Sequence, residues 1–507
     1  MKTKLIIAGL LAIGAVSCSK DFVDQQPPNS VQVGQYFTTE NNINLGLNGL
    51  YQSLRSGDAV GEGAVTWTDD RSDDINTTDN QSNNGEPFQF TAFSLTPSNT
   101  WLKNHWYALY LPIYRANEML GSIDTVTFAS ADTKARFMGE MKFVRAFMYF
   151  NLVKEFGDVP LVTEALSSPA RANQLTVRVA RKEVYAQIIK DLTEALQTPM
   201  PVAQTAATTG RASLRAVNAL LGKVYLTMAA SGVDNSRANF ESAKTYLLAC
   251  MNQRTFGNLS EIDYASVFDV AQKTTNAELI WQIPYIQGDQ NYSSAIARNN
   301  QARGETINSR FVSTGTGQLV SDDFRKEVET GDIRGDYSFK YAADPSVQRY
   351  FITKFRDNSA TAGTLGRGGN DWILLRYADV MLTLAEAHMN LGEDAQAIAL
   401  LDQVRTRAGL LSYSASQLVG DYATRFPTLK LALLHERRME LSFEHHRWHD
   451  LVRFFNADEL VAYFRTKNQA DYNNSPLSNI SPKDYYFPIP IDEVNINPVG
   501  MPQNTGY

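Results

Sequence analysis

One stretch of the chain, residues 373–409, constrains the fold more strongly than any other. It reads ILLRYADVMLTLAEAHMNLGEDAQAIALLDQVRTRAG. Four polar residues recur in it at spacings of four, three and four, with mostly apolar residues between them: Asp379, Thr383, Glu386 and Asn390. On a helix this spacing makes one narrow stripe. We expect the stripe to face water and both flanks of the helix to be packed, as in an inner helix of a stack.

A tight turn and a second helix follow in the same stretch. Gly392 suits the left-handed residue that ends a helix, and the acidic residues Glu393 and Asp394 suit the start of the next one. Small residues, Ala385 and Ala397, stand where the two helices would cross. Such a pair resembles the tetratricopeptide helical hairpin. One hairpin cannot bury its own apolar surface, so neighbouring pairs must cover it.

Further helical patterns occupy the first half of the chain. Gly157 and Pro160 end the strongest of them, and Gly222 on one helix faces Ala243 on its partner. The expected helices cover about 40–54, a segment from Trp101, 137–156, 184–197, 213–230 and 239–253. The predicted fold class is mainly α: a tetratricopeptide-like superhelix of helical pairs, with a loop-rich, irregular second region containing a few short strands.

The N-terminus has the features of an export signal. Lys2 and Lys4 precede an apolar run too short to span a bilayer, which ends in Ala15-Val16-Ser17-Cys18. This looks like a bacterial lipobox, with residues 1–17 removed, Cys18 acylated and 18–38 forming a polar tether. The alternative is an ordinary secretory signal with a chance cysteine. The other cysteine, Cys250, lies in an apolar helical run and is expected in the core.

Length and charge restrict the remaining possibilities. A chain of 507 residues with 43% hydrophobic content can bury a large core. Its net charge of −7, without a basic cluster along the sequence, argues against nucleic acid as a partner. We expect an N-terminal region over 39–254, an irregular region over 255–372 and a C-terminal helical region with an extended tail over 373–507.

Residues 55–99 form a long segment rich in Gly, Asn, Thr and Asp, and loops of this length are usually functional or disordered. Trp67 stands beside Asp69, Asp70 and Arg71, a flat ring with bidentate polar groups that could hold a sugar. A calcium-binding loop and a solvated acidic loop fit the same residues. The glycine and terminal glutamate of an EF-hand are absent.

The irregular region supplies further candidates for ligand binding. Its strand-like runs are LIWQIPY and YFITKF, and glycine-rich loops separate them. A single ring here is more often a core residue than a binding residue. The candidate contacts, with Trp101 from the first half, are Tyr285, Tyr292, Arg303, Phe311, Arg367 and Trp372.

No catalytic constellation is found. His445 and His449 have the spacing of a helical zinc site, but His446 stands where that motif has glutamate. Nucleophile-elbow, phosphate-loop and dinucleotide motifs are absent. Charges of alternating sign at Glu436, Arg437, Arg438 and Glu440 are interpreted as ion pairs within and between helices. The sequence therefore predicts no enzyme, no metal and no cofactor, with a structural Ca²⁺ in the acidic loop as the open alternative.

Several blocks together resemble the SusD/RagB family of outer-membrane nutrient-binding lipoproteins. They are the lipobox at Cys18, KFVRAFMYFNLVKEFGDVPLV, RYADVMLTLAEA, HERRMELSFEHHRWHDLVRF and YYFPIPIDEVNINP. The resemblance implies a lipid-anchored protein of the outer membrane that faces the cell exterior. It also implies binding of glycans, or in some branches peptides, and a SusC-like TonB-dependent transporter as partner. Family ligand residues lie on variable loops, so these blocks do not locate them.

Four hypotheses follow. The first is a non-catalytic receptor that binds oligosaccharides and delivers them to the transporter. The second keeps this role with oligopeptides as cargo. The third is a glycoside hydrolase, and the fourth is a structural lid without a ligand site. The loop composition favours the first two over the fourth.

Overall fold

The computed structural model describes residues 36–76, 79–473 and 476–507. The predicted signal peptide, Cys18 and most of the predicted tether lie outside the described residues. Among the helices that are described, none combines the length and the apolar character needed to cross a bilayer.

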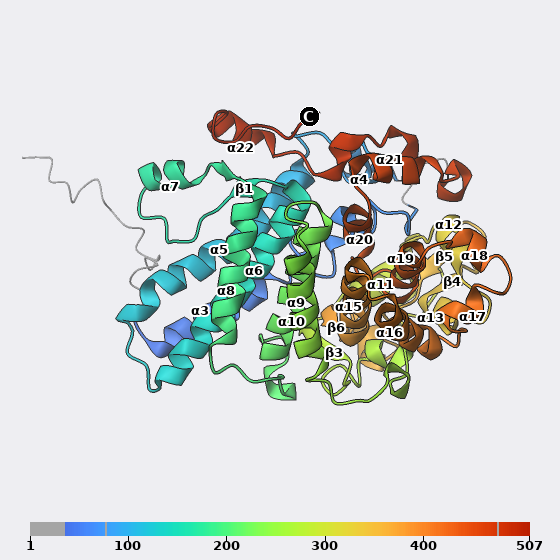
Figure 1. Ribbon diagram of the computed structural model, residues 1–507, viewed down its shortest axis with the longest axis horizontal. Coiled ribbons are helices and arrows are strands. Elements are labelled where there is room, and N and C mark those ends of the chain that lie inside the picture. The colour runs from blue at the N-terminus through green and yellow to red at the C-terminus, as the bar shows by residue number, and fades with distance from the viewer. Residues whose placement is uncertain (1–35, 77–78, 474–475) are drawn as a thin grey trace, which may run out of the picture.

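Helices pair along the chain and the pairs stack, as predicted. Each helix contacts its partner, and the second helix of each pair contacts the first helix of the next. In Figure 1 the stack runs from α3 and α5 on the left, through α9 and α10, to α15 and α16. The four pairs in the described part of the chain are α3 (Glu40–Ser53) with α5 (Thr100–Ser122), α6 (Ala131–Phe156) with α8 (Arg181–Leu196), α9 (Leu214–Ala230) with α10 (Arg237–Met251), and α15 (Tyr377–Leu391) with α16 (Asp394–Arg407).

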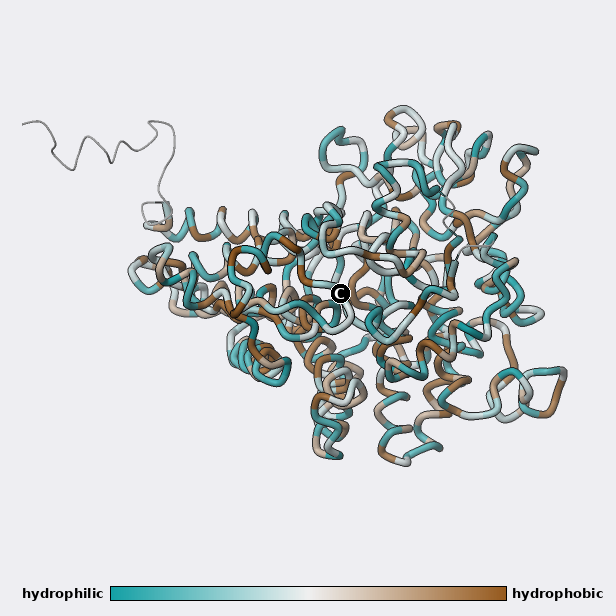
Figure 2. The backbone as a smooth tube through the Cα atoms, turned by 90° about the horizontal axis from the view of Figure 1, so that it is seen from above, coloured by the Kyte–Doolittle hydropathy of each residue, from teal (hydrophilic) through white to brown (hydrophobic). Residues whose placement is uncertain are grey.

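One hydrophobic core runs through all four pairs. Leu47, Leu109, Val144, Leu221 and Leu382, from five different helices, belong to it and are fully buried. Hydrophobic and hydrophilic stretches alternate along the helices in Figure 2, as expected for helices that bury one face. Burial of this shared core, and not the propensity of any single helix, holds the pairs together.

The residues that set the helix boundaries act largely as predicted. Gly392 ends α15 with a left-handed φ of 78°. A Cβ on Gly222 would lie 2.4 Å from Leu247 Cγ, so the close crossing of α9 and α10 requires glycine there. The main difference is α6, which begins at Ala131, six residues before the predicted start. The Ser130 side chain caps it by accepting from the Asp132 N–H.

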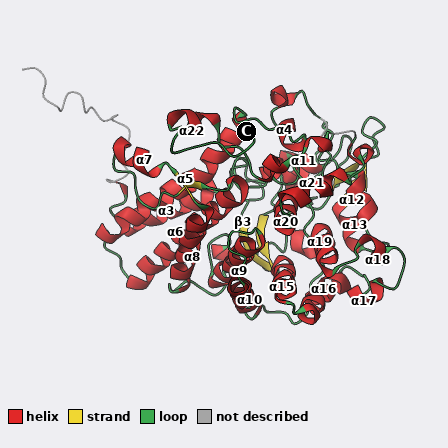
Figure 3. Cartoon of the chain, turned by 45° about the horizontal axis from the view of Figure 1, so that its top comes forward, coloured by secondary structure: helices red, strands yellow, loops and turns green. Residues whose placement is uncertain are grey.

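Short strands complete the frame, and Figure 3 shows them as a minor part of a helical molecule. The predicted strand-like runs are confirmed as β3 (Leu279–Ile283) and β5 (Tyr350–Ile352). Antiparallel pairs join β1 (Val159–Pro160) to β2 (Arg178–Val179), β3 to β6 (Trp372–Arg376), and β4 (Phe339–Tyr341) to β5. Strand β6 was not expected, because residues 373–376 were assigned to the helical hairpin. A short apolar run fits a buried strand as well as a buried helix.

The C-terminal part adds a second layer of helices and an extended tail. Its longer helices are α19 (Leu429–Glu440), α20 (Arg447–Phe454) and α21 (Ala457–Arg465). The predicted extended segment around Pro488 is present, and the Phe487 N–H donates to the Glu155 carbonyl at 2.7 Å. The chain then forms a short helix that was not predicted, α22 (Ile491–Ile496).

Short helices lie in the loops between these elements. They are α4 (Phe88–Thr91), α7 (Pro169–Leu175), α11 (Ile296–Asn300), α12 (Asp322–Glu327), α13 (Ile333–Ser338), α14 (Ala360–Leu365), α17 (Tyr413–Ser416) and α18 (Tyr422–Arg425).

The polar stripe of α15 does not face water, contrary to the prediction. All of its residues except Asn390 are at most 2% exposed. Arg437 of α19 donates to Asp379 Oδ1 at 3.0 Å, and Arg453 of α20 donates to Glu386 Oε2 at 2.8 Å. A polar stripe on a helix can therefore be buried between helices, when a second layer of helices supplies side chains of the opposite charge.

The charged residues of α19 pair with other elements. Glu436 accepts from Arg334 of α13 at 2.6 Å and from Arg405 of α16 at 2.9 Å. Arg438 donates through Nε to Asp74 at 2.8 Å. The prediction of ion pairs between helices is therefore confirmed. No ion pair among the residues described joins two of the four charged positions singled out on α19.

We expect Arg438→Ala to lower stability strongly. The Arg438 guanidinium is fully buried against Asp73, Asp74 and Asp323, so its removal leaves carboxylates buried without their counter-charge. Removing one partner of a buried pair costs about 3–5 kcal/mol. Denaturant unfolding of the soluble form that starts after Cys18 measures the loss.

The matched control is Arg237→Ala. Arg237 pairs with Glu241 on the same helix, but their side chains are 67% and 41% exposed. Its loss is expected to cost at most about 0.5 kcal/mol. Equal destabilisation by the two variants would contradict the role given to the buried network.

Candidate functional site

The acidic loop that begins at Asp69 is buried. Asp73 and Asp74 are 0% exposed, and Asp69 and Asp70 are 1% and 7% exposed. A solvated acidic loop, one of the alternatives for this segment, therefore does not fit. Burial would raise the pKa of Asp73, but Arg438, Arg447 and Lys467 outweigh it and hold that pKa well below its usual value.

Three candidate residues lie in the interior. Trp67 is 1% exposed and stacks on His105 with ring centroids 4.3 Å apart. Arg71 is 0% exposed and donates to the Asp484 carbonyl at 2.7 Å. Trp372, in β6, is 2% exposed. These three side chains are packed inside the protein and do not face solvent.

A different group of candidates lines an open pocket of about 290 Å³. Trp101 at the start of α5 is half-buried there, next to Asp69 and Asp70. Asn299 and Asn300 of α11 form another part of its wall, with Glu62 and Gln318. Asp69 Oδ1 is buried without a hydrogen-bond partner among the described residues. The pocket therefore combines one ring with several amide and carboxylate groups.

Two exposed rings lie on loops near this pocket. Tyr292 is 45% exposed and Phe311 is 37% exposed. The Arg55 guanidinium lies 4.9 Å from the Tyr292 ring centroid, and that of Arg298 lies 4.6 Å from the Phe311 ring centroid. Tyr285 is 5% exposed and packs on the other side of Arg55, at 4.6 Å.

Hydrogen bonds join the loop that carries Tyr292 to the pocket. Glu62, a pocket residue, accepts from the Ser294 hydroxyl and from the Ala295 N–H, the latter at 2.7 Å. Ser294 and Gly368 exchange backbone hydrogen bonds of 2.8 and 2.7 Å, which place Arg367 beside the Tyr292 loop. We call the pocket together with Arg55, Tyr292, Arg298, Phe311 and Arg367 the loop face.

The structure thus separates the predicted contacts into two groups. Asp69, Asp70 and Trp101 line the pocket, and Tyr292, Phe311 and Arg367 lie around it. Arg303 is exposed and donates to the Thr314 carbonyl at 3.1 Å. Sequence reasoning missed Arg55, Glu62 and Arg298, since nothing in the sequence shows that the end of α3 meets a loop more than 200 residues later.

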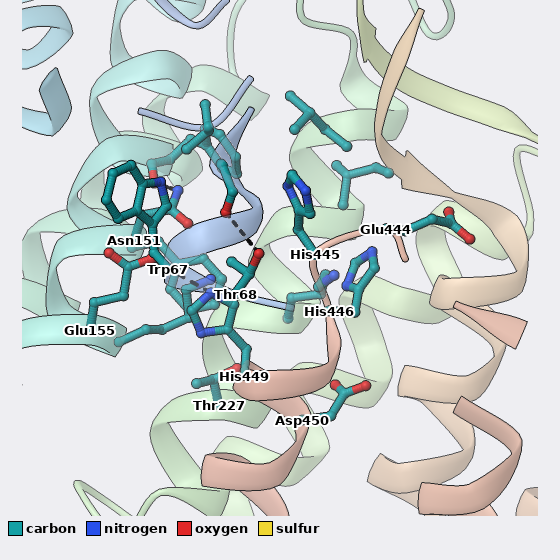
Figure 4. Close-up of a pocket in the computed structure, with 18 of the residues that line it drawn as sticks. Trp67, Thr68, Asn151, Glu155, Thr227, Glu444, His445, His446, His449 and Asp450 are labelled. Atoms are coloured by element: carbon teal, nitrogen blue, oxygen red, sulfur yellow. Dashed lines mark hydrogen bonds and ion pairs between the residues drawn. The ribbon is translucent and has the colours of Figure 1, made fainter. Parts of the chain in front are cut away.

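A second pocket, of about 100 Å³, lies between α6, α9, β6 and the turn before α20. Figure 4 shows Trp67, Glu155 and the three histidines among the residues that line it. His445 precedes α20 and has a φ of 63°, so it is not on a helix with His449. The four-residue spacing therefore does not bring these imidazoles together as a helical zinc site does.

The electrostatics of this cavity favour neutral imidazoles. Burial lowers the pKa of His445 to about 3 and that of His446 to about 4. His449 lies 3.5 Å from Glu155, yet burial and the nearby Lys154 hold its pKa well below its usual value. Across the described residues, His, Cys, Asp and Glu form no group of three or more suited to a metal ion.

Two family models match this chain. The model described as "SusD family" matches residues 340–507, and the model described as "Starch-binding associating with outer membrane" matches residues 21–226. The chain belongs to the SusD/RagB family. Two relatives in this family are SusD-like protein P2 of Formosa agariphila, 25% identical over the full length of both chains, and a SusD-like protein of Bacteroides ovatus, 22% identical over 92% of this chain and 85% of that protein.

Solved SusD structures have the same fold. A SusD homolog from Bacteroides thetaiotaomicron is 23% identical, with a TM-score of 0.76 over 94% of this chain and 99% of that one. A laminarin-binding SusD-like protein is 25% identical, with a TM-score of 0.72 over 93% of this chain and 100% of that one. Surface glycan-binding protein A from Bacteroides thetaiotaomicron, solved with laminarihexaose, is 19% identical, with a TM-score of 0.74 over 92% and 100%.

We expect this SusD-family chain to lose stability as the pH falls from about 6.5 towards 4. In that window an unfolded histidine, with a pKa near 6.5, binds a proton, whereas folded His446, with a pKa of about 4, does not. The unfolded state then gains protons, and the free energy of unfolding falls by up to about 3 kcal/mol. Denaturant midpoints at pH 7 and pH 5 measure this fall.

His446→Gln is the variant that assigns the effect. Glutamine does not titrate, so the variant should lose less stability between pH 7 and pH 5 than the unmodified protein. An identical pH dependence in the two proteins would show that another group causes the loss.

Proposed function

We propose that this chain is a non-catalytic surface lipoprotein that binds oligosaccharides at the loop face. The observation that carries the proposal is the pocket beside Trp101, with the exposed rings of Tyr292 and Phe311 on neighbouring loops. Sugars present apolar C–H faces and many hydroxyl groups. A binding site for them therefore needs flat rings and polar side chains close together, and the loop face supplies both.

The carboxylates near the pocket already have structural partners. Glu62 is bound by Ser294 and Ala295, and Asp74 by Arg438. Burial, together with Asp74 and Asp70, raises the pKa of Asp69 well above its usual value. Glu62 and Asp74, held by these partners, are not free to act as the two carboxyl groups that hydrolysis of a glycosidic bond needs, which supports binding over hydrolysis.

Delivery to a TonB-dependent transporter in the outer membrane completes the proposal. It rests on family membership, and one matching family model is described by its association with the outer membrane. The helical frame is rigid and its core is continuous, so the frame can hold the loop face in a fixed position while residues 18–38 connect it to the membrane.

Tyr292→Ala is expected to weaken oligosaccharide binding roughly fivefold or more, because a ring that contacts the ligand contributes about 1 kcal/mol or more. Calorimetric titration of the soluble form with a panel of oligosaccharides measures the loss. Tyr107→Ala is the matched control, since Tyr107 is also 45% exposed but lines a separate groove on α5. Failure of every glycan to bind, or equal effects of the two variants, would overturn the assignment of the site.

Cys18→Ala is expected to release the protein from the membrane. A single cysteine with several acyl chains anchors a protein stably, and without the thiol no acyl chain can be attached. Incorporation of labelled fatty acid and the share of protein in the membrane fraction measure the change. Cys250→Ala is the control, because Cys250 is fully buried in α10. Unchanged membrane association of Cys18→Ala would contradict the anchor.

A further inference from the structure

Arginines gather on the loops of the loop face, beside a pocket that is itself lined by Glu62, Asp69 and Asp70, although the chain as a whole has a net charge of −7. Residues 290–320 contain three arginines and a single acidic residue, Glu305. Glu305 is itself paired with Lys340 at 3.0 Å. Residues 358–370 add Arg367 and no acidic residue. The net charge of these two segments is therefore positive, opposite in sign to the net charge of the whole chain.

Two arginines of the loop face, Arg55 and Arg298, lie over its rings. Arg55 lies between Tyr285 and Tyr292, at 4.6 and 4.9 Å from their centroids, and its Nε is buried without a hydrogen-bond partner among the described residues. Arg298 is exposed and lies over Phe311. A guanidinium that lies over a ring can still donate from its N–H edge, although Arg55 also has a hydrogen bond with Tyr285.

Two more arginines lie next to Phe311. A Cβ on Gly366 would lie 3.0 Å from the Phe311 ring, so the residue before Arg367 packs directly on that ring. Arg310 precedes Phe311 and donates through Nε to the Asn358 carbonyl at 3.0 Å. Arg310 and Arg367 are both exposed. Arg55, Arg298, Arg310 and Arg367 thus belong to one connected surface.

None of these four arginines has a carboxylate within 4.0 Å among the described residues. The acidic side chains nearby bind elsewhere. Asp289 accepts from the N–H groups of Asn291 and Tyr292 at 2.7 and 2.9 Å, and Asp357 accepts from the Gly369 N–H at 2.7 Å. In the core, by contrast, arginines such as Arg376 and Arg438 each contact several carboxylates.

We infer that the loop face selects anionic saccharides, in which a uronate carboxylate or a sulfate ester meets the free guanidinium edges. This deepens the proposed function and rests on it. Arginine binds carboxylate and sulfate groups through paired N–H donors, and these bonds are about twice as strong as those between neutral groups. The rings would contact the sugar face, and Arg55 and Arg298, which lie over two of these rings, would meet its anionic substituents.

The experiment uses matched ligands that differ in one functional group, which is charged in one member of each pair and neutral in the other. The soluble form is titrated with an oligogalacturonate and its methyl ester, and with a sulfated oligogalactan and its desulfated form. We expect at least one charged member to bind about tenfold or more tightly than its neutral counterpart. Its affinity should fall as salt is raised from low to physiological ionic strength. The pair that shows the difference identifies carboxylate or sulfate as the group recognised.

Variants then assign the preference to the loop face. Arg298→Gln and Arg55→Gln should each reduce the advantage of the charged ligand while leaving the neutral one less affected. Arg465→Gln is the control, because Arg465 of α21 is exposed and, among the described residues, has no carboxylate within 4.0 Å. Equal binding of both members of each pair, or a preference that both variants leave intact, overturns the inference alone. Binding of no glycan at all overturns the proposed function with it.

Discussion

Arg438 is buried against the carboxylates of Asp73 and Asp74, and this contact joins two parts of the chain that are more than 360 residues apart. Arg447 and Tyr463 bind the same Asp73 from α20 and α21, at 2.7 and 2.5 Å. Charges buried in this way cannot exchange their partners for water without a large cost. The loop after α3 is therefore held in one position although it has little regular structure. The pocket wall formed by Glu62, Asp69 and Asp70 depends on that position.

The same physical principle organises the second layer of helices. Arg437 and Arg453 reach the carboxylates of α15, and Glu436 and Glu440 receive arginines from α13, α16 and β6. Replacing such pairs by apolar residues is often neutral for stability, so stability alone does not explain them. They do fix which helix faces which, because a shifted register would leave several charges unpaired at once. A frame of this kind can carry long loops without losing its own arrangement.

Much of the helical frame could be predicted from the sequence, because its signals are local. The 3.6-residue period, the left-handed Gly392 and the small Gly222 each act within one helix or one hairpin. The burial of the polar stripe on α15 could not be predicted, since Arg437 and Arg453 lie 58 and 67 residues away from the carboxylates they bind. Strand β6 was missed for the same reason, because its partner β3 lies in another region of the chain. In each case a non-local partner decided the structure.

For the loop face, the sequence predicted the types of residue better than it predicted which of those residues are exposed. Tyr292 and Phe311 are predicted ligand contacts on loops, and both are exposed. Trp67 and Trp372 are predicted on the same grounds, but both are buried. Composition does not separate these cases, because the residue type is the same whether a ring is exposed or buried in the core. Arginine shows this most clearly. Arg376 and Arg438 are fully buried among carboxylates, but Arg298 and Arg367 are exposed where acidic side chains are scarce or already engaged. Because the core takes up so many carboxylates, an acidic chain can still present arginines without a paired carboxylate on its surface loops.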